Sequence, residues 1–471
     1  MKSTRRTFLT QTAAAGALAQ TARRRPNVLF LMPDDMRVEL GCYSSRFDAR
    51  TPNLDTLARS GVRFDRNYCQ FPLCNPSRSS LMTGRHPTTT GVLGNRTAFR
   101  DAHPDWISLP QLFKQNGYVS CRTGKIFHGG IDDPKAWTVA GGATDEEGAA
   151  GLDAAHSNLT RAQYSDRILV LEGNGENHGD YKTADRAISF LRQYKDQPFF
   201  IGCGFVKPHS PPTAPRRFFD LYDVSRIQLP PDFAAAPTVP PGFPKAAIRP
   251  RNADLFIGRN ASEPEARKVI QAYLASISWV DWNVGRVLAE LDRLGLRQNT
   301  IVVFVADHGY QLGEKGKWSK AGSLFEMGTR VPMIIQVPGM KGNGQASLRV
   351  VQSVDIYATL VELCGLPLPS GNEGRSLAPL LHDPRAAWQH PAYSVWSEDG
   401  ETLHGVAVRT AKYRYAEFGP NGQNGAMLFD SYADPFEMTN LADDPKYAKD
   451  RAELSPLVRD YAARLGTRRS A

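Results

Sequence analysis

The sequence predicts an α/β protein built around a large mixed, mostly parallel sheet that lies between helices. Three runs of consecutive apolar residues, at 27–32, 199–205 and 300–306, are typical of strands that are buried on both faces. Segments with the spacing of amphipathic helices separate these runs, among them 52–62, 184–194 and 265–294. Strands that alternate with helices favour parallel pairing, because a parallel connection needs a long crossover.

The segments between these elements predict one more helix, one more strand and two irregular regions. Residues 108–117 favour a helix, and 118–122 favour a strand that leads into 124–128. The Gly- and Asp-rich region 132–180 predicts a surface insertion. The Pro-rich region 211–250 is too long for a simple connection, and loops of this length are often functional.

The pattern changes near residue 386. Short alternating runs at 392–396, 405–410, 413–418 and 426–429 predict a small antiparallel sheet. A terminal amphipathic helix follows, with Leu454, Leu457, Tyr461 and Leu465 on one face. We therefore expect a catalytic α/β domain over 26–385 and a C-terminal subdomain over 386–471.

Composition excludes several classes of protein. The 471 residues are 41% hydrophobic and 22% charged, as in ordinary globular proteins. The net charge of +9 is not gathered into a basic run with interleaved aromatic residues, so nucleic acid binding is not indicated. No apolar run of about 20 residues predicts a transmembrane span. The six cysteines are scattered without a Cys-x-x-Cys pair, which argues against a zinc ribbon.

The N-terminus has the pattern of an export signal. Arg5 and Arg6 form a twin-arginine motif, and an Ala-rich stretch after them ends in Ala17-Leu18-Ala19, a small-x-small cleavage pattern. A basic tail without function is the alternative. We expect 1–25 to be a twin-arginine signal peptide and leader, and the mature protein to be periplasmic or extracellular.

Acidic residues follow two of the apolar runs. Asp34-Asp35 ends the first, and Asp307-His308 ends the third. In open α/β sheets ligands bind at the carboxyl ends of the strands, so these side chains should meet at one edge. Adjacent carboxylates repel each other unless a cation lies between them, which favours Ca²⁺ or Mg²⁺. Taken singly, each pair also fits an ordinary polar turn, and histidine is unusual for a hard cation.

A second set of side chains is cationic. It comprises Arg78, Lys125, His128, Lys207, His209 and Lys320, with Lys315 and Lys317 nearby. Each alone is more often a surface or structural residue. Two of its pairs, Lys125/His128 and Lys207/His209, follow strands of the predicted sheet. Cations gathered there around a nucleophile would suit the ester of a tetrahedral oxyanion.

Cys74 stands before Asn75-Pro76, a signal for the start of a helix. The thiol should therefore lie at or just before a helix N-terminus, where the helix dipole favours an anion. A free cysteine is more often only a small buried residue.

The segment Cys74-x-Pro76-Ser77-Arg78-x-x-Leu81-x-Thr83-Gly84 resembles the full signature of the type I sulfatases. The resemblance covers nearly the whole chain. It includes 27–35, Gly124-Lys125-x-Phe127-His128, Lys207-Pro208-His209, Asp307-His308-Gly309 and Asp434-Pro435-x-Glu437-x-x-Asn440-Leu441. Four segments are closer to the iduronate-2-sulfatase-like subgroup than to arylsulfatases: Gly41-Cys42-Tyr43, the block 124–128, Lys207-Pro208-His209 and 278–286. That subgroup also has histidine after the metal-binding aspartate, which accounts for His308.

The resemblance implies an alkaline-phosphatase-like fold and a mechanism. A maturation enzyme would convert Cys74 to formylglycine, whose hydrate attacks sulfur. A divalent metal, Ca²⁺ in preference to Mg²⁺, would be held by Asp34, Asp35, Cys74 in its modified form, Asp307 and His308. Arg78 and Lys125 would orient the hydrate, and His128 would be the base that releases sulfate. His209 or Lys320 would serve the leaving alcohol and bind sulfate.

The implied substrate is a sulfated carbohydrate, cleaved by exo action on a uronate- or galactose-type glycan. Candidate substrate contacts are Lys207, Asn95, Arg100 and His404, with Arg96, Arg409, Lys412 and Arg414 as further possibilities. Two other functions remain open at this point. One is hydrolysis of phosphonate or phosphodiester esters, and the other is non-catalytic glycan binding.

Overall fold

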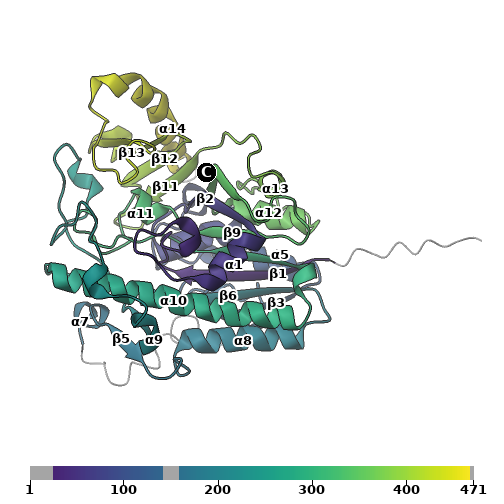
Figure 1. Ribbon diagram of the computed structural model, residues 1–471. Coiled ribbons are helices and arrows are strands. Elements are labelled where there is room, and N and C mark those ends of the chain that lie inside the picture. The colour runs from purple at the N-terminus through teal and green to yellow at the C-terminus, as the bar shows by residue number, and fades with distance from the viewer. Residues whose placement is uncertain (1–24, 142–158, 467–471) are drawn as a thin grey trace, which may run out of the picture.

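The computed structural model describes residues 25–141 and 159–466 of the chain (Figure 1). The twin-arginine motif and the middle of the predicted surface insertion lie outside these ranges, so export stays a prediction. In the described ranges, no helix is long and apolar enough to cross a membrane.

An eight-stranded sheet forms the centre of the molecule. Its strand order is β10-β2-β9-β8-β1-β6-β3-β4. The strands are β1 (Asn27–Asp34), β2 (Val62–Tyr68), β3 (Val119–Gly124), β4 (Val139–Gly141), β6 (Phe199–Pro208), β8 (Thr300–Val305), β9 (Met333–Gln336) and β10 (Ala346–Gln352). Only β9 runs antiparallel to its neighbours. The predicted mixed, mostly parallel sheet is confirmed.

Strand β1 shows why the sheet needs helices on both faces. Leu29 and Leu31 point into one apolar core, whereas Val28, Phe30 and Met32 point into another. Successive side chains of a strand face opposite sides, so an unbroken apolar run must be covered twice.

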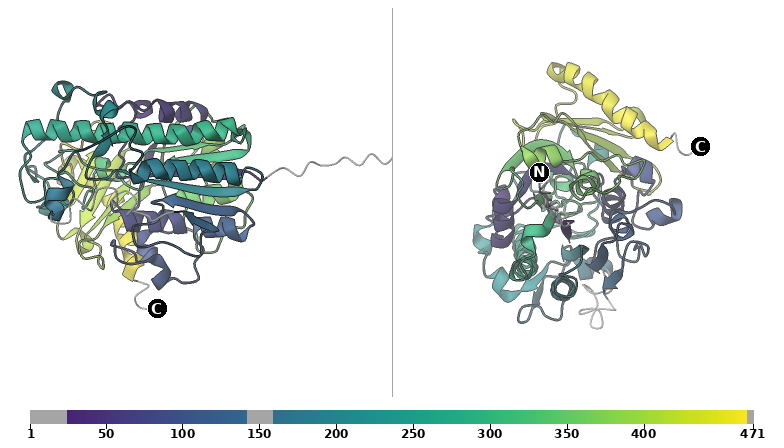
Figure 2. Two further views of the ribbon diagram at one scale, coloured as in Figure 1. Left: turned by 90° about the horizontal axis from the view of Figure 1, so that it is seen from below. Right: turned by 90° about the vertical axis from the view of Figure 1, so that its right-hand side faces the viewer.

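The helices form a layer on each face, which makes the molecule a three-layered sandwich (Figure 2). The first core is covered by α1 (Pro52–Ser60), α8 (Gly179–Gln193) and α10 (Glu263–Arg293). The second is covered by α2 (Cys74–Thr83), α5 (Leu109–Gln115), α12 (Asp355–Leu363) and α13 (Ala378–His382). The start of the long α10 is fixed by a capping box, in which Ser262 and Glu265 each accept the other's backbone N–H.

Shorter elements fill the connections. The helices are α3 (Pro87–Thr90), α4 (Phe99–Ala102), α7 (Arg161–Ser165), α9 (Arg216–Phe219) and α11 (Glu326–Thr329), and β5 (Leu169–Leu171) pairs with β7 (Thr213–Pro215). The Pro-rich region is irregular, as predicted, apart from β7, α9 and two short 3-10 turns. It packs on the loop after β8, where the backbone N–H of Lys315 donates to the carbonyl of Asp232.

The C-terminal part contains its own sheet (Figure 1). Strands β11 (Ala392–Trp396), β12 (Gly405–Arg409), β13 (Tyr413–Phe418) and β14 (Ala426–Asp430) pair antiparallel in sequence order. Helix α14 (Ala448–Gly466) covers it with Leu454 and Tyr461. The predicted small sheet and terminal helix are confirmed. The domain limits of 26–385 and 386–471 stay a prediction, and the change between the two sheets falls between α13 and β11.

Candidate active site

Cys74 is the first residue of α2, as the Asn75-Pro76 pair predicts. It is 1% exposed, at the edge of the sheet where β1 and β8 end. The backbone N–H of Asn75 donates to Oδ1 of Asn95 at 3.1 Å, which satisfies one of the free donors at the helix start. The Cys74 Sγ atom lies 3.4 Å from Asp34 Oδ1 and 3.2 Å from His308 Nε2. This thiol occupies the position that a formylglycine side chain would take.

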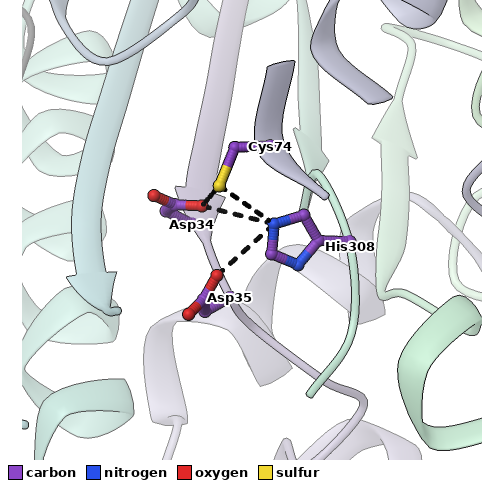
Figure 3. Close-up of side chains that lie close together, drawn as sticks. All are labelled: Asp34, Asp35, Cys74 and His308. Carbon is purple, nitrogen blue, oxygen red and sulfur yellow. Dashed lines mark hydrogen bonds and ion pairs between the residues drawn. The ribbon is translucent and has the colours of Figure 1, made fainter. Parts of the chain in front are cut away.

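Four side chains converge on one point (Figure 3). Asp34, Asp35, Cys74 and His308 each offer a ligand atom, and these atoms lie within 4.8 Å of one another. His308 Nδ1 lies 3.0 Å from the carbonyl of Gly309, so this nitrogen carries the proton and Nε2 faces the cluster. Within the described ranges, the buried Oδ1 of Asp35 has no hydrogen-bond partner. A buried carboxylate oxygen and an imidazole nitrogen aimed at one point fit a divalent cation.

The electrostatics of the cluster also favour a bound cation. Burial raises the pKa of Asp35 well above its usual value, with Lys320 opposing the shift and Asp34 adding to it. Burial alone would lower the pKa of His308, but Asp307 and Cys74 outweigh it and raise that pKa to about 10. A proton is therefore drawn into the cluster to balance its negative charge, which is the role that a metal ion would otherwise fill.

Asp307 lies beside the cluster and is held by several donors. Its Oδ1 accepts from the backbone N–H groups of Asp35 at 3.2 Å and His308 at 2.9 Å. Its Oδ2 accepts from Arg78 Nε at 2.8 Å and lies 3.4 Å from His308 Nε2. Asp307 is not one of the four residues whose ligand atoms lie within 4.8 Å of one another, so its role as a metal ligand stays a proposal.

Arg78 and Lys125 surround the same centre. Arg78 projects from α2 one turn after Cys74, and its Nη1 donates to the carbonyls of Lys125 and, at 3.2 Å, Ile126. Its Nη2 lies 3.6 Å from Asp34 Oδ1, and Lys125 Nζ lies 2.6 Å from Asp34 Oδ2. Burial opposes ionisation of Asp34, but Lys125 and Arg78 hold its pKa well below the usual value.

Replacing Arg78 with lysine should lower kcat roughly 100-fold, because one ammonium cannot span Asp307, Asp34 and the two carbonyls at once. The melting temperature should fall too, since Asp307 Oδ2 loses a buried charged donor. Turnover of an aryl sulfate and thermal unfolding would measure the two effects. Arg59→Lys, on the exposed face of α1, is the control. An unchanged kcat in Arg78→Lys would contradict this role.

Lys320 and His209 come from other elements. Lys320 Nζ lies 3.0 Å from Asp35 Oδ2 and 3.3 Å from Asp254 Oδ1. His209 follows β6 and is half-buried, with Nδ1 2.7 Å from the carbonyl of Ser210. Burial and the charge of Lys320 lower the pKa of His209 well below its usual value. Lys320 is thus the charged group here, and His209 is neutral. His128 lies half-buried four residues beyond β3.

The structure gives the candidate substrate contacts other partners. Lys207 Nζ donates to the carbonyls of His209 at 3.0 Å and Pro211 at 2.9 Å, so it fixes the backbone that carries His209. Asn95 caps α2, as described above. Arg100 donates to Asp133 and Gln111, and Nδ1 of His404 accepts from the backbone N–H of Glu398. Direct binding of substrate by these four residues stays a prediction.

Arg409 and Arg414 belong to a buried ion network between the two sheets. Arg414 pairs with Glu326 at 2.6 Å and Glu437 at 2.7 Å, and Arg409 Nε lies 3.5 Å from Glu326. Glu437 also accepts from the backbone N–H of Glu326, at the start of α11. Glu437, in the motif Asp434–Leu441, therefore connects the C-terminal part to α11. The carbonyls of α11 in turn accept hydrogen bonds from the backbone N–H groups of Gly309 and Tyr310.

Sequence reasoning missed Asp254. This residue is 2% exposed, and its Oδ1 lies 3.3 Å from Lys320 Nζ and 3.7 Å from Arg161. In the described ranges, its Oδ2 has no hydrogen-bond partner although it is buried. Asp254 follows the Pro-rich region, where no strand end or periodic pattern marks it.

Comparisons with known proteins identify the family of this chain. A family model described as Sulfatase matches residues 26–366. The chain belongs to the sulfatase family. It is therefore a sulfuric ester hydrolase. A second model, for the C-terminal part of N-sulphoglucosamine sulphohydrolase, matches residues 313–463.

Relatives of this sulfatase cover most of its length. It is 33% identical to a sulfatase of Formosa agariphila over 92% of this chain and 86% of that one. It is also 33% identical to human iduronate 2-sulfatase, over 83% and 84% of the two chains. The second match agrees with the subgroup that the motifs indicate.

Solved structures confirm the alkaline-phosphatase-like fold. A sulfatase structure from Bacteroides thetaiotaomicron matches with a TM-score of 0.70 at 25% identity, over 95% of this chain and 94% of that one. A phosphonate monoester hydrolase from Silicibacter pomeroyi matches with 0.76 at 22% identity, over 93% and 95%. The second likeness shows the fold alone.

Proposed function

We propose that this sulfatase hydrolyses sulfate esters on a sulfated carbohydrate, by exo action, through a formylglycine at position 74 and a bound Ca²⁺. The observation that carries the proposal is the burial of Cys74 among Asp34, Asp35 and His308, with Arg78, Lys125 and Lys320 around them. Relatives named iduronate 2-sulfatase, ulvan-active sulfatase and N-acetylglucosamine-6-O-sulfatase support a sugar substrate.

Asp34, Asp35, Asp307 and His308 would hold the metal together with the modified residue 74. When bound, the cation would polarise an oxygen of the sulfate group. Formylglycine at position 74 would supply, as its hydrate, the hydroxyl that attacks sulfur. Its formation needs a maturation enzyme, which we propose as a partner of this chain.

The residues of the chain would orient the reactants and move protons. Arg78 and Lys125 flank Asp34, so they would fix the groups on residue 74 and stabilise negative charge there. On the opposite side Lys320 would stabilise the leaving sugar oxygen as its bond to sulfur breaks, and His209 would contact the sulfate. His128 would accept a proton from residue 74 when sulfate is released.

A substrate panel tests the proposal. We expect kcat/KM for a sulfated uronate to exceed that for a phosphodiester of similar size by roughly 100-fold or more. The site would be complementary to the sulfate ester, whereas a bound phosphodiester would leave some of its polar groups unpaired. An aryl sulfate serves as the reference for sulfate chemistry without a sugar. Faster turnover of the phosphodiester, or no turnover of any sulfated sugar, would contradict the proposed function.

A further inference from the structure

Lys317 lies on a rigid segment beside the candidate active site, three residues before Lys320. The backbone of this segment is fixed against the chain around Asn252. Asn252 Oδ1 accepts from the N–H of Trp318 at 2.9 Å, and its Nδ2 donates to the carbonyl of Gly316 at 3.3 Å. Trp318 is fully buried and packs on Phe256. The position of Lys317 relative to Lys320 is therefore set by the fold.

The Lys317 ammonium is buried without a counter-ion. The residue is 2% exposed, and the hydrogen bond of its Nζ goes to the carbonyl of Arg251, at a long 3.4 Å. In the part of the chain that the structure describes, no carboxylate oxygen lies within 4.0 Å of it. Lys125, Lys315 and Lys320 do have one, at 2.6, 2.7 and 3.0 Å. Among the described residues, buried Lys207 has none either, but its Nζ donates to two carbonyls at 3.0 and 2.9 Å. A buried charge is costly unless it is paired, so the ammonium of Lys317 is suited to an anion from outside the chain.

Arg249 adds a second cation next to Lys317. Its guanidinium lies over the ring of Trp396 and pairs with Glu398 at 2.8 Å. Gly322 leaves room for it, because a Cβ at that position would lie 2.6 Å from Arg249 Cδ. Burial and the charge of Arg249 lower the pKa of Lys317 to about 8, and a bound anion would reverse that shift.

The two carboxylates near Lys317 and Arg249 already have cationic partners. Asp254 is shared by Lys320 and Arg161, and Glu398 is shared by Arg249 and the Trp396 ring N–H, which donates to it at 2.8 Å. Asp254 Oδ2 is nevertheless a buried acceptor without a partner among the described residues. In the portion that the structure describes, Lys317 thus offers a cation without a carboxylate partner, and Asp254 offers a buried oxygen without a hydrogen-bond donor, beside the proposed leaving-group side of the site.

We propose that Lys317 and Arg249 form a subsite for a second anionic group on the sulfated sugar, a carboxylate or a further sulfate. Asp254 Oδ2 accepts a hydrogen bond from a hydroxyl of the same sugar. The proposal rests on the proposed function and narrows its substrate to sugars with two anionic groups. It also explains why this chain carries a lysine where a buried position would ordinarily be apolar.

The test compares three substrates with Lys317→Gln. They are a sulfated uronate, a disulfated neutral sugar and a monosulfated neutral sugar. We expect kcat/KM to fall about 30-fold for the substrates whose second anion fits, mainly through KM, and to change less than about 2-fold for the monosulfated sugar. Which of the doubly anionic substrates loses more shows whether the second group is a carboxylate or a sulfate.

Lys341→Gln is the matched control, because it removes the same charge from an exposed turn after β9, at the opposite edge of the sheet. Arg249→Gln is the second variant. The Arg249 side chain is 31% exposed, so its replacement should disturb folding less than that of Lys317. This variant should lower kcat/KM for the same substrates, by a smaller factor. Equal losses on all three substrates, or no loss on any, would overturn the subsite. If the enzyme without substitutions, carrying formylglycine at position 74, acts on no sulfated sugar, both the proposed function and the subsite are overturned.

Discussion

Replacing Cys74 with alanine will lower turnover of every sulfate ester by about 10⁴-fold or more, because the group that attacks sulfur derives from this side chain. The substitution leaves the start of α2 intact, since Pro76 and the Asn95 contact to the Asn75 N–H do not depend on the thiol. Rates on an aryl sulfate and on a sulfated sugar would measure the loss. Mass spectrometry of the peptide that spans position 74 would show formylglycine in protein made with a maturation enzyme.

Cys364→Ala is the matched control. Cys364 follows α12 and lines a cavity together with Arg25 and Asn299, at the edge of the sheet where β1 and β8 begin. It should keep full activity and the modification at 74. Active protein with an unmodified thiol at position 74 would refute the formylglycine mechanism and leave the family assignment untouched.

Removing divalent cations with a chelator should abolish activity and lower the free energy of unfolding, and Ca²⁺ should restore both. Asp34, Asp35 and Asp307 are buried around one point, and their mutual repulsion is relieved by a bound cation. A ligand at about 100 times its dissociation constant stabilises a native protein by about 2.7 kcal/mol. Thermal unfolding with and without Ca²⁺ would measure the stabilisation, and Mg²⁺ in place of Ca²⁺ would test the choice of metal.

Asp35→Asn should lose the response to Ca²⁺, because the Oδ1 of Asp35 has no hydrogen-bond donor among the described residues and lies 3.4 Å from His308 Nε2 in the cluster, and because an amide is a poorer ligand. Asp48→Asn is the control, because the Asp48 side chain is largely exposed, and this variant should respond to Ca²⁺ like the protein without substitutions. Full activity in the presence of a strong chelator, with an unchanged melting temperature, would rule out a metal at this site.

The ion network around Glu326 gives the C-terminal part a role in holding the site. Arg414 and Glu437 fix the start of α11, and α11 carbonyls accept the N–H groups of Gly309 and Tyr310, directly after His308. The small sheet also reaches the approach to Cys74, since Ser394 Oγ donates to the carbonyl of Cys69 and the Val395 N–H to that of Gln70. The C-terminal part therefore supports both segments that meet at residue 74.

The sequence by itself determined the elements whose signals are local. Long apolar runs can be covered only by helices on both faces, so 27–32, 199–205 and 300–306 predicted the central strands. The Asn-Pro pair predicted the helix that begins at Cys74, because proline suits the first turn. Parallel strands end at the same edge, which is why Asp34 and His308, far apart in the chain, were expected to meet.

Only the tertiary structure decided which polar residues pair with each other. Arg78, Lys125 and Lys320 look alike in a sequence, yet in the fold the shortest ion pair of each is with a different residue, Asp307, Asp34 and Asp35 respectively. Arg100, Arg409 and Arg414 have their charges satisfied elsewhere, and Asp254 enters the site from an irregular segment. In the described structure Lys317 and Lys207 are both buried without a carboxylate partner, but Lys207 donates to two carbonyls and Lys317 contacts one, at 3.4 Å. Charge pairing at a distance depends on which loops pack together, and no local pattern in the chain encodes that packing.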